Sequence, residues 1–423
     1  MLRKTIMLAA LLLGTSAALA RPAVSKAAAG ADGHYLFVWA GDQDKQGNDF
    51  LAVINADPGS PEYGRLVTSV GTDQKSVRIH HTEYEMPASG MLFANDHDAN
   101  RTFIFDLRDP RHPKVATSFT DMAGYSHPHS FLRLPNGNVL ASFQHRAQAM
   151  AHGAIDHSSL GHSAMAAGVQ EKTGGLVEID DAGRVIRSAS SADPAFRGEV
   201  LMPYSLAVLP GIDRVVSTNS SMHDDNLMLG TTFQLWRLSD LKLLKTEYLG
   251  VGKTRTGHID PEEPRVGQDG AVYVQTLSCG IERITELAGE NPVATLVHTF
   301  PGNFCGVPTI VGHYLIQSVE ATHGYIVIDI ADGAHPVEVS RLSLGDDYVP
   351  HWTSWDAKAQ RLIVTPNVGS RAYLLKLDMA TGTLSIDDKF RDIDGKVGFS
   401  FASRSWPHGW TGTGKPHGAV GSR

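Results

Sequence analysis

The chain has few of the features that stabilise small disulfide-rich proteins or mark membrane proteins. Among its 423 residues there are two cysteines, and charged residues make up 19%. Two cysteines exclude a disulfide framework as the basis of the fold. Beyond the amino-terminal residues, no apolar run approaches the roughly 20 residues that a membrane-spanning helix needs. The sequence therefore argues against an integral membrane protein.

Clusters of basic residues are also missing from the chain after its first few residues. The formal net charge is −8. Proteins that bind nucleic acid or anionic membrane surfaces carry clustered Lys and Arg. We therefore expect neither nucleic acid nor a membrane as a partner, and a small molecule as the substrate.

The first twenty residues have the layout of a secretory signal peptide. Arg3 and Lys4 precede an apolar run from Ile6 to Leu13, and the segment ends in Ala-Leu-Ala at residues 18–20. This order of charged, apolar and small residues is typical of cleaved export signals. We expect residues 1–20 to be removed and the protein to be secreted, most simply into a bacterial periplasm.

One segment shape recurs along the rest of the chain. Short apolar strands alternate with joints of Gly, Asn and Asp, as in MLFAND with TFIFDL and RLIVTPN with AYLLKLD. The successive copies open at His81, His129, Tyr204, Glu263, Gly306 and His351. Their spacing is 43 to 59 residues, with one exception of 75 residues. Four-stranded propeller blades repeat every 40 to 50 residues or so, and this spacing predicts such blades.

The one long spacing and the two chain ends complete the predicted ring. The 75-residue interval contains an apparent insertion at about residues 145–172. The amino-terminal segment supplies three strands, and the tail KPHGAV has the Pro-His opening that is also found in VPHW. We therefore predict an all-β, seven-bladed β-propeller closed by a C-terminal strand, with residues 21–423 as a single domain that has few exposed sheet edges.

The residues that open the repeats carry the candidate chemistry. In a propeller these positions face one central channel, where imidazoles and a carboxylate from separate strands suit zinc, copper or iron. The predicted metal ligands are His81, His129, His417, His351, His80 and Glu263. The loops that follow the second strands add His97, His145, His223, Cys279 and His323 on the same face. Any one of these histidines could instead be an ordinary surface or core residue.

Three of the channel residues are candidates for catalysis. Tyr204 could donate a proton and Glu263 could act as a general base, because burial tunes such groups. Alternatively, Tyr204 lines the wall and Arg265 neutralises Glu263. His80 could orient a substrate, since strand alternation sends it to the face opposite His81 unless it lies in a loop.

Two further features have open interpretations. Cys279 and Cys305 should lie on the same face in neighbouring blades, where a disulfide, copper ligation or two separate thiols are possible. The insertion contains His145, His152, His157 and His162 with Met150 and Met165. Imidazole with thioether favours copper, and a surface lid over the channel mouth is the alternative.

These motifs resemble the selenium-binding protein family, whose characterised bacterial members are copper-dependent methanethiol oxidases with a seven-bladed propeller. The matching segments are His80-His81, HPHSF with His129, PYSLAVLPGIDRVVSTN with Tyr204, PEEPRV with Glu263, and the late His417. The resemblance implies His81, His129 and His417 as the main metal ligands, with His80 and Glu263 next. The cysteine-rich stretch that follows the paired histidines in many members is replaced here by EYEMPASGML.

The sequence leaves three functions open. The first is a periplasmic copper oxidase that acts on a small sulfur compound; for methanethiol, the resemblance implies formaldehyde, hydrogen sulfide and hydrogen peroxide as products. The second is a propeller hydrolase of the lactonase kind, in which a metal polarises a carbonyl. The third is a module that binds or delivers copper to an exchange partner. Zinc, iron or calcium are the alternative metals.

Overall fold

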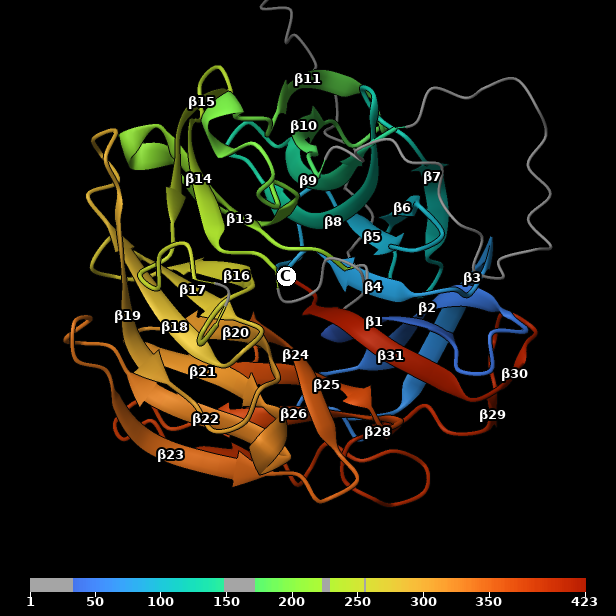
Figure 1. Ribbon diagram of the computed structural model, residues 1–423. Coiled ribbons are helices and arrows are strands. Elements are labelled where there is room, and N and C mark those ends of the chain that lie inside the picture. Colours follow the sequence, from blue (N-terminus) through green and yellow to red (C-terminus); the bar gives the residue numbers. More distant parts are fainter. Residues whose placement is uncertain (1–32, 148–171, 223–228, 255) are drawn as a thin grey trace, which may run out of the picture.

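The computed structural model describes residues 33–147, 172–222, 229–254 and 256–423. Seven antiparallel sheets are arranged around a central axis in this part of the chain, so the predicted propeller is confirmed (Figure 1). In each sheet the strands run outward from an innermost strand near the axis. The predicted signal peptide and nearly all of the insertion lie outside the described residues.

The first blade combines strands from both ends of the chain, and the other blades follow one another in the order of the sequence. The first blade contains β31 (Gly414–Gly421), β1 (Tyr35–Asp42), β2 (Asn48–Asn55) and β3 (Leu66–Lys75). The second contains β4 (Ile79–Thr82), β5 (Met91–Asp96), β6 (Arg101–Asp106) and β7 (Lys114–Phe119). The third contains β8 (Tyr125–Arg133), β9 (Val139–Arg146), β10 (Gly175–Ile179) and β11 (Val185–Ser190).

The remaining blades repeat this order. The fourth contains β12 (Pro203–Leu209), β13 (Arg214–Asn219), β14 (Thr232–Arg237) and β15 (Lys242–Tyr248). The fifth contains β16 (Pro261–Val266), β17 (Val272–Thr276), β18 (Gly280–Thr285) and β19 (Val293–Thr299). The sixth contains β20 (Cys305–Val311), β21 (Tyr314–Val319), β22 (Gly324–Asp329) and β23 (Val337–Ser343). The seventh contains β24 (Val349–Asp356), β25 (Arg361–Val368), β26 (Arg371–Leu377) and β27 (Leu384–Ile386).

The seventh blade departs from the four-strand pattern. A short fifth strand, β28 (Phe399–Ser400), pairs with β26, and β29 (Arg404–Ser405) forms a hairpin with β30 (Thr411–Gly412). The described helical turns are η1 (Pro194–Phe196), η2 (Pro210–Ile212) and η4 (Glu320–Thr322). Within the described ranges, no helix has the length and apolar character needed to cross a membrane.

The ring closes by pairing the two ends of the described chain. Strand β31 is antiparallel to β1, with Leu36 opposite Gly421 and Asp42 opposite Gly414. The red C-terminal strand therefore lies beside the blue N-terminal strands (Figure 1). The indole of Trp352 in the seventh blade donates a hydrogen bond to the carbonyl of Ala419, at 2.9 Å. The C-terminal closing strand is as predicted.

Hydrophobic clusters hold neighbouring blades together. In β1, Leu36 and Val38 belong to a cluster shared with the seventh blade, whereas Phe37 and Trp39 belong to one shared with the second. Alternate side chains of a strand face opposite sides of a sheet, so both faces of the inner strands are buried. This explains why these strands read as continuous apolar runs rather than as alternating ones.

One covalent bond adds to this packing. Cys279 follows β17, Cys305 begins β20, and their sulfur atoms form a disulfide between the fifth and sixth blades. The disulfide is therefore the correct one of the three interpretations of this pair. Both residues are fully buried.

Candidate metal centre

A β-bulge interrupts the innermost strand of each blade at the same depth. In the second blade, Ile79 pairs with Asp96 and Thr82 pairs with Ala94. The chain therefore advances by three residues on β4 where it advances by two on β5. The same extra residue occurs on β8, β12, β16, β20, β24 and β31. A bulge adds one residue to a strand and re-aims its side chains. The residues at these bulges are His80-His81, His129-Ser130, Tyr204-Ser205, Glu262-Glu263, Gly306-Val307, His351 and His417-Gly418.

The bulge on β4 corrects the expectation for His80. Alternation predicted that His80 and His81 would face opposite sides of the strand, with His80 at the centre only if it lay in a loop. Both residues lie in β4, and their rings are stacked with centroids 3.9 Å apart. They are 3% and 0% exposed. The extra residue thus brings both imidazoles to the centre.

Four histidines form the first group of candidate ligands. His80, His81, His351 and His417 each offer a nitrogen atom, and these atoms lie within 4.8 Å of one another. The His417 ring is 4.6 Å from those of both His80 and His351. Gly306 makes this arrangement possible, because a Cβ there would lie 2.7 Å from His351 Nδ1. The sixth blade therefore contributes space instead of a ligand.

His81 also belongs to a second group, with His129 and Glu263. The His81 and His129 ring centroids are 4.5 Å apart, and Glu263 Oε1 lies 3.6 Å from His81 Nδ1. The Nε2 atom of His80 lies 2.7 Å from that of His129 and links the two groups. The structure therefore brings together all six residues that the sequence predicted as ligands.

Several atoms of this centre that could bind a metal are buried and have no hydrogen-bond partner. They are His81 Nε2, His351 Nδ1, His417 Nδ1 and Glu263 Oε1. Buried polar atoms are nearly always paired, so such a set requires an explanation. A bound metal ion fits it, because imidazole nitrogen and carboxylate oxygen are metal ligands.

The protonation of the histidines also fits a metal. Burial, followed by the proximity of the other histidines, holds the pKa of His80, His81 and His417 well below the ordinary value. The pKa of His129 is lowered in the same direction, first by burial and then by His97. Because neutral imidazole is the form that binds a metal, the centre is poised for ligation at pH 7.

Glu263 has one occupied and one open carboxylate oxygen. Its Oε2 accepts hydrogen bonds from Ser205 Oγ at 2.7 Å, Tyr84 OH at 2.5 Å and Arg265 Nη1 at 3.2 Å. The contact with Arg265 that the sequence suggested is therefore present. Only Oε1 remains for an ion or a proton, which suits a ligand better than a mobile general base.

Tyr204 lies beside the centre without belonging to either ligand group. Its ring centroid is 3.6 Å from that of His129. Burial and the neighbouring carboxylates of Glu262 and Glu263 raise the pKa of its phenol well above the ordinary value. Burial and Asp260 likewise raise the pKa of Glu262, which hydrogen-bonds Tyr204. Tyr204 and Glu262, whose pKa values are both raised, therefore lie next to each other, with the Tyr204 ring against that of His129.

Glu262 and Tyr84 are site residues that the sequence analysis missed. Glu262 directly precedes the predicted Glu263, and the bulge on β16 brings the two residues together. Tyr84 follows β4 and stacks on Trp352 with ring centroids 4.8 Å apart. The Arg265 guanidinium lies 3.9 Å from the centre of the Tyr84 ring. Tyr84, Trp352 and Arg265 thus pack against one another, and Tyr84 and Arg265 contact Glu263.

The other predicted residues lie away from the ligand groups. The His97 ring is 6.0 Å from that of His80, and His145 lies farther out, separated from His97 by the ring of His127. His323 follows η4 and lies 3.3 Å from the carbonyl of Tyr348. The remaining histidines of the insertion and His223 lie outside the described residues.

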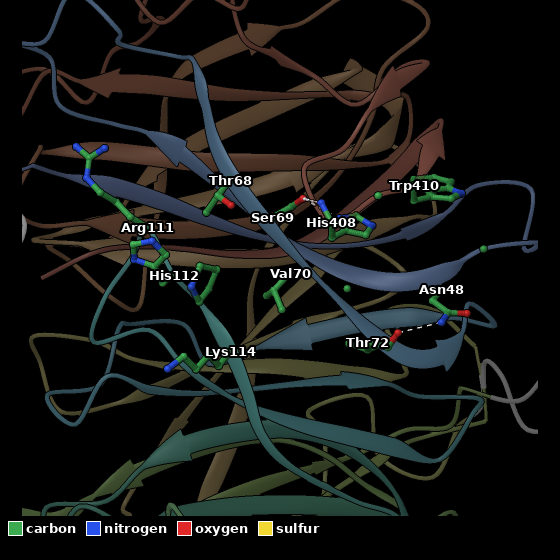
Figure 2. Close-up of a pocket in the computed structure, with 14 residues that line it drawn as sticks. Asn48, Thr68, Ser69, Val70, Thr72, Arg111, His112, Lys114, His408 and Trp410 are labelled. Atoms are coloured by element: carbon green, nitrogen blue, oxygen red, sulfur yellow. Dashed lines mark hydrogen bonds between the residues drawn. The ribbon is translucent and has the colours of Figure 1, made fainter.

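Two pockets differ in their relation to the centre. One, of about 420 Å³, is lined by Ile79 and Lys415, which lie one and two residues from His80 and His417. The other, of about 770 Å³, lies over β3, the outermost strand of the first blade, beside Arg111 and His408 (Figure 2). Only the first is close to the candidate ligands.

Comparison with known proteins agrees with the resemblance seen in the motifs. The chain is 37% identical over 106 residues to a methanethiol oxidase of a Hyphomicrobium species and 29% identical over 113 residues to one of Ruegeria pomeroyi. These matches span 24% and 25% of this chain, and 24% and 26% of the two relatives. No family model matches the chain.

Solved structures share the fold over nearly the whole length. A hypothetical selenium-binding protein from Sulfolobus tokodaii has a TM-score of 0.67 at 16% identity, covering 91% of this chain and 92% of that one. A periplasmic gluconolactonase from Pseudomonas aeruginosa has a TM-score of 0.57 at 12% identity, covering 84% and 94%. In sequence the chain is thus distantly similar to the methanethiol oxidases, on a propeller fold that it shares with a hypothetical selenium-binding protein.

Proposed function

We propose that this protein is a periplasmic copper-dependent oxidase of a small sulfur compound, similar to the methanethiol oxidases. The observation that carries the proposal is the buried centre of five histidines and Glu263, with its unpartnered donor atoms. The matched segments of the curated relatives support the choice of reaction. Because those matches cover about a quarter of each relative, the activity and substrate are carried here as a proposal.

The donor set and the proposed reaction together disfavour calcium and zinc, and the resemblance to the methanethiol oxidases favours copper over iron. His80, His81, His351, His417 and His129 offer imidazole nitrogen, and Glu263 offers one oxygen. Calcium prefers six to eight oxygen ligands, so calcium fits poorly. Imidazole suits copper, zinc and iron, and a thiol oxidation requires a metal that changes oxidation state, which zinc does not. When bound, copper would supply the route by which electrons leave the sulfur compound for dioxygen.

The chain's own residues would hold protons beside the reacting atoms. Burial raises the pKa of both the Tyr204 phenol and the Glu262 carboxyl, which favours their protonated forms. Gln275 Nε2 fixes Glu262 by a hydrogen bond of 3.1 Å to Oε2. Hydrogen sulfide and hydrogen peroxide, the products that the resemblance implies, both need protons. We assign the proton supply to Tyr204 with Glu262.

The pocket beside β31 is a suitable entrance through which a thiolate substrate could reach the centre. Lys45, Arg78 and Lys415 contribute to its lining, and Lys415 is a neighbour of the ligand His417. Convergent positive charge attracts small anions and raises their local concentration. A thiolate drawn into this pocket would arrive next to the histidines.

The first test is the metal content of the purified protein. We expect about one copper per chain in the wild type and loss of copper in the variant with His81→Ala and His129→Ala. Thiol oxidation would then be assayed by dioxygen uptake and hydrogen sulfide release with methanethiol. Calcium, or no metal in either protein, would contradict the proposal.

Two alternatives have specific support. The fold resembles that of a periplasmic gluconolactonase, which supports a hydrolase as the first alternative. Lactone hydrolysis without dioxygen uptake would identify the protein as such a hydrolase. A copper-delivery module is suggested by the His/Met-rich insertion in the sequence. Deleting residues 146–170 should abolish copper binding by such a module, but should leave the copper of a channel enzyme in place.

A further inference from the structure

Three histidines outside the ligand groups form a line from the centre towards the surface. The His97 ring lies 5.8 Å from His129 and 6.0 Å from His80. The next ring, His127, is 5.5 Å from His97, and His145 is 5.1 Å from His127. The centroids of successive rings along the line are thus 5.1 to 6.0 Å apart.

The line runs outward from the buried interior across two blades and ends at His145, whose Nε2 atom is still buried. His97 follows β5 and is fully buried, whereas His127 on β8 and His145 on β9 are half-buried. His127 has a left-handed backbone with φ of 56°, which is uncommon for a residue other than glycine. Asn100 Oδ1 accepts a hydrogen bond from the backbone N–H of His127 at 2.7 Å and supports this conformation. His127, the middle residue of the line, therefore has a strained backbone.

The other approaches to the centre are unfavourable for a cation. On the side of Glu263, Tyr84 and Arg265 hydrogen-bond its carboxylate and also line a pocket of about 450 Å³, so a cation entering there meets the Arg265 guanidinium. In the pocket beside β31, Lys45, Lys415 and Arg78, the last of which is paired with Asp98, outnumber the one carboxylate of the lining, Asp42. A metal ion would be repelled there, although an anion would be attracted. The imidazole line is the approach that offers ligands to a cation at each step.

We propose that His145, His127 and His97 form a loading path along which a metal ion reaches the buried centre. The inference rests on the proposed metal centre and adds the way in which it is filled. The ion is passed by ligand exchange between neighbouring imidazoles, ending at His129 and His80. His97 is held by Asp98 Oδ1 at 2.9 Å and Gln144 Oε1 at 3.1 Å. Its ring must leave at least one of these bonds to accept the ion, so His97 is the slow step.

The path predicts a kinetic effect that is separate from the affinity of the centre. Metal-free protein is mixed with copper(I) held by the chromophoric chelator bicinchoninate, and the loss of absorbance reports loading. For the variant with His127→Ala and His145→Ala, we expect loading to be at least tenfold slower, with the same final copper per chain. Thermal unfolding of the metal-free variant checks that it is folded.

A matched control removes two histidines that are not on the path. His112 and His335 are exposed, and each bonds the aspartate three residues before it. The variant with His112→Ala and His335→Ala should load at the wild-type rate. Equal rates for the path variant and this control would overturn the proposal, as would loss of final stoichiometry in the path variant. A wild type that takes up no copper would instead contradict the proposed function.

Discussion

His80 Nε2 and His129 Nε2 lie 2.7 Å apart, although the two residues come from different blades. One of the two nitrogens must carry the proton of this contact, and the other must offer its lone pair. Both rings cannot be charged at such a distance. At least one of the two rings is therefore neutral, which is the form that a metal ion requires.

The stability of the metal-free protein should depend on the protonation of His351. Burial, and then the charge of Lys415, lower its pKa to about 4 from the ordinary value of 6.5. The unfolded chain then takes up the proton first, so the contribution of neutral His351 is present above pH 6.5 and is lost as the pH falls to 4. The difference in pKa corresponds to about 3 kcal/mol.

The measurement compares wild type with His351→Gln in urea unfolding at several pH values. We expect the free energy of unfolding of the wild type, relative to the variant, to fall by about 3 kcal/mol between pH 7 and pH 4. Titrating groups that do not interact with His351 occur in both proteins and cancel in this comparison. A difference that is independent of pH would show that His351 titrates normally.

Replacing the proton donors should reduce turnover and leave the metal in place. Tyr204→Phe and Glu262→Gln remove ionisable protons but keep the shapes of the side chains. Loss of a positioned acid costs roughly 10²- to 10⁴-fold in rate. We expect kcat to fall in this range with copper per chain unchanged, measured by dioxygen uptake and elemental analysis. Retention of full activity by both variants would remove these residues from the mechanism.

Gly306→Ala should disturb the centre by pushing His351 away. The added Cβ would lie 2.7 Å from His351 Nδ1 and 2.8 Å from its carbonyl oxygen, closer than van der Waals contact allows. Overpacking of this kind costs about 1–3 kcal/mol. We expect weaker copper binding in a competition titration. Gly211→Ala is the control, because a Cβ added at Gly211 would have no neighbouring atom within 4 Å; equal affinities would show that His351 is not a ligand.

Removing the closing strand should destabilise the whole ring. A chain that ends at Pro416 lacks most of β31 and exposes the core that Ala419 and Val420 complete. We expect its melting temperature to fall by on the order of 10 °C or the cooperative transition to disappear. A chain that lacks only the exposed Arg423 is the control. Unchanged melting of the chain that ends at Pro416 would refute closure by β31.

The disulfide should add stability to two neighbouring blades. Cys279 and Cys305 are 26 residues apart, and a loop of this size corresponds to about 3 kcal/mol. We expect Cys279→Ala and Cys305→Ala each to lower the free energy of unfolding by about this amount. Because either change breaks the same bond, the double variant should be little worse than the single ones. Additive losses in urea unfolding would indicate that burial of the sulfur atoms, and not the bond, is responsible.

The sequence by itself determined the repeat. Apolar strands of fixed spacing such as those after His81 and His351 can only be buried by stacking blade against blade, and the missing strand of the first segment matched the spare strand at the C-terminus. The histidines that open the repeats share a register, so a centre on the axis followed from symmetry. These properties depend on local patterning, which the sequence contains directly.

The tertiary structure alone decided which side chains meet at the centre. Strand alternation placed His80 opposite His81, but a bulge on each inner strand brings such neighbours, His80 with His81 and Glu262 with Glu263, to the same site. A proline stands directly before five of the bulges, at positions 128, 203, 261, 350 and 416. Proline inside a strand often marks a bulge, but it does not state which side chains are re-aimed. That depends on pairing with the second strand of each blade, which is a contact between segments and not a property of either one.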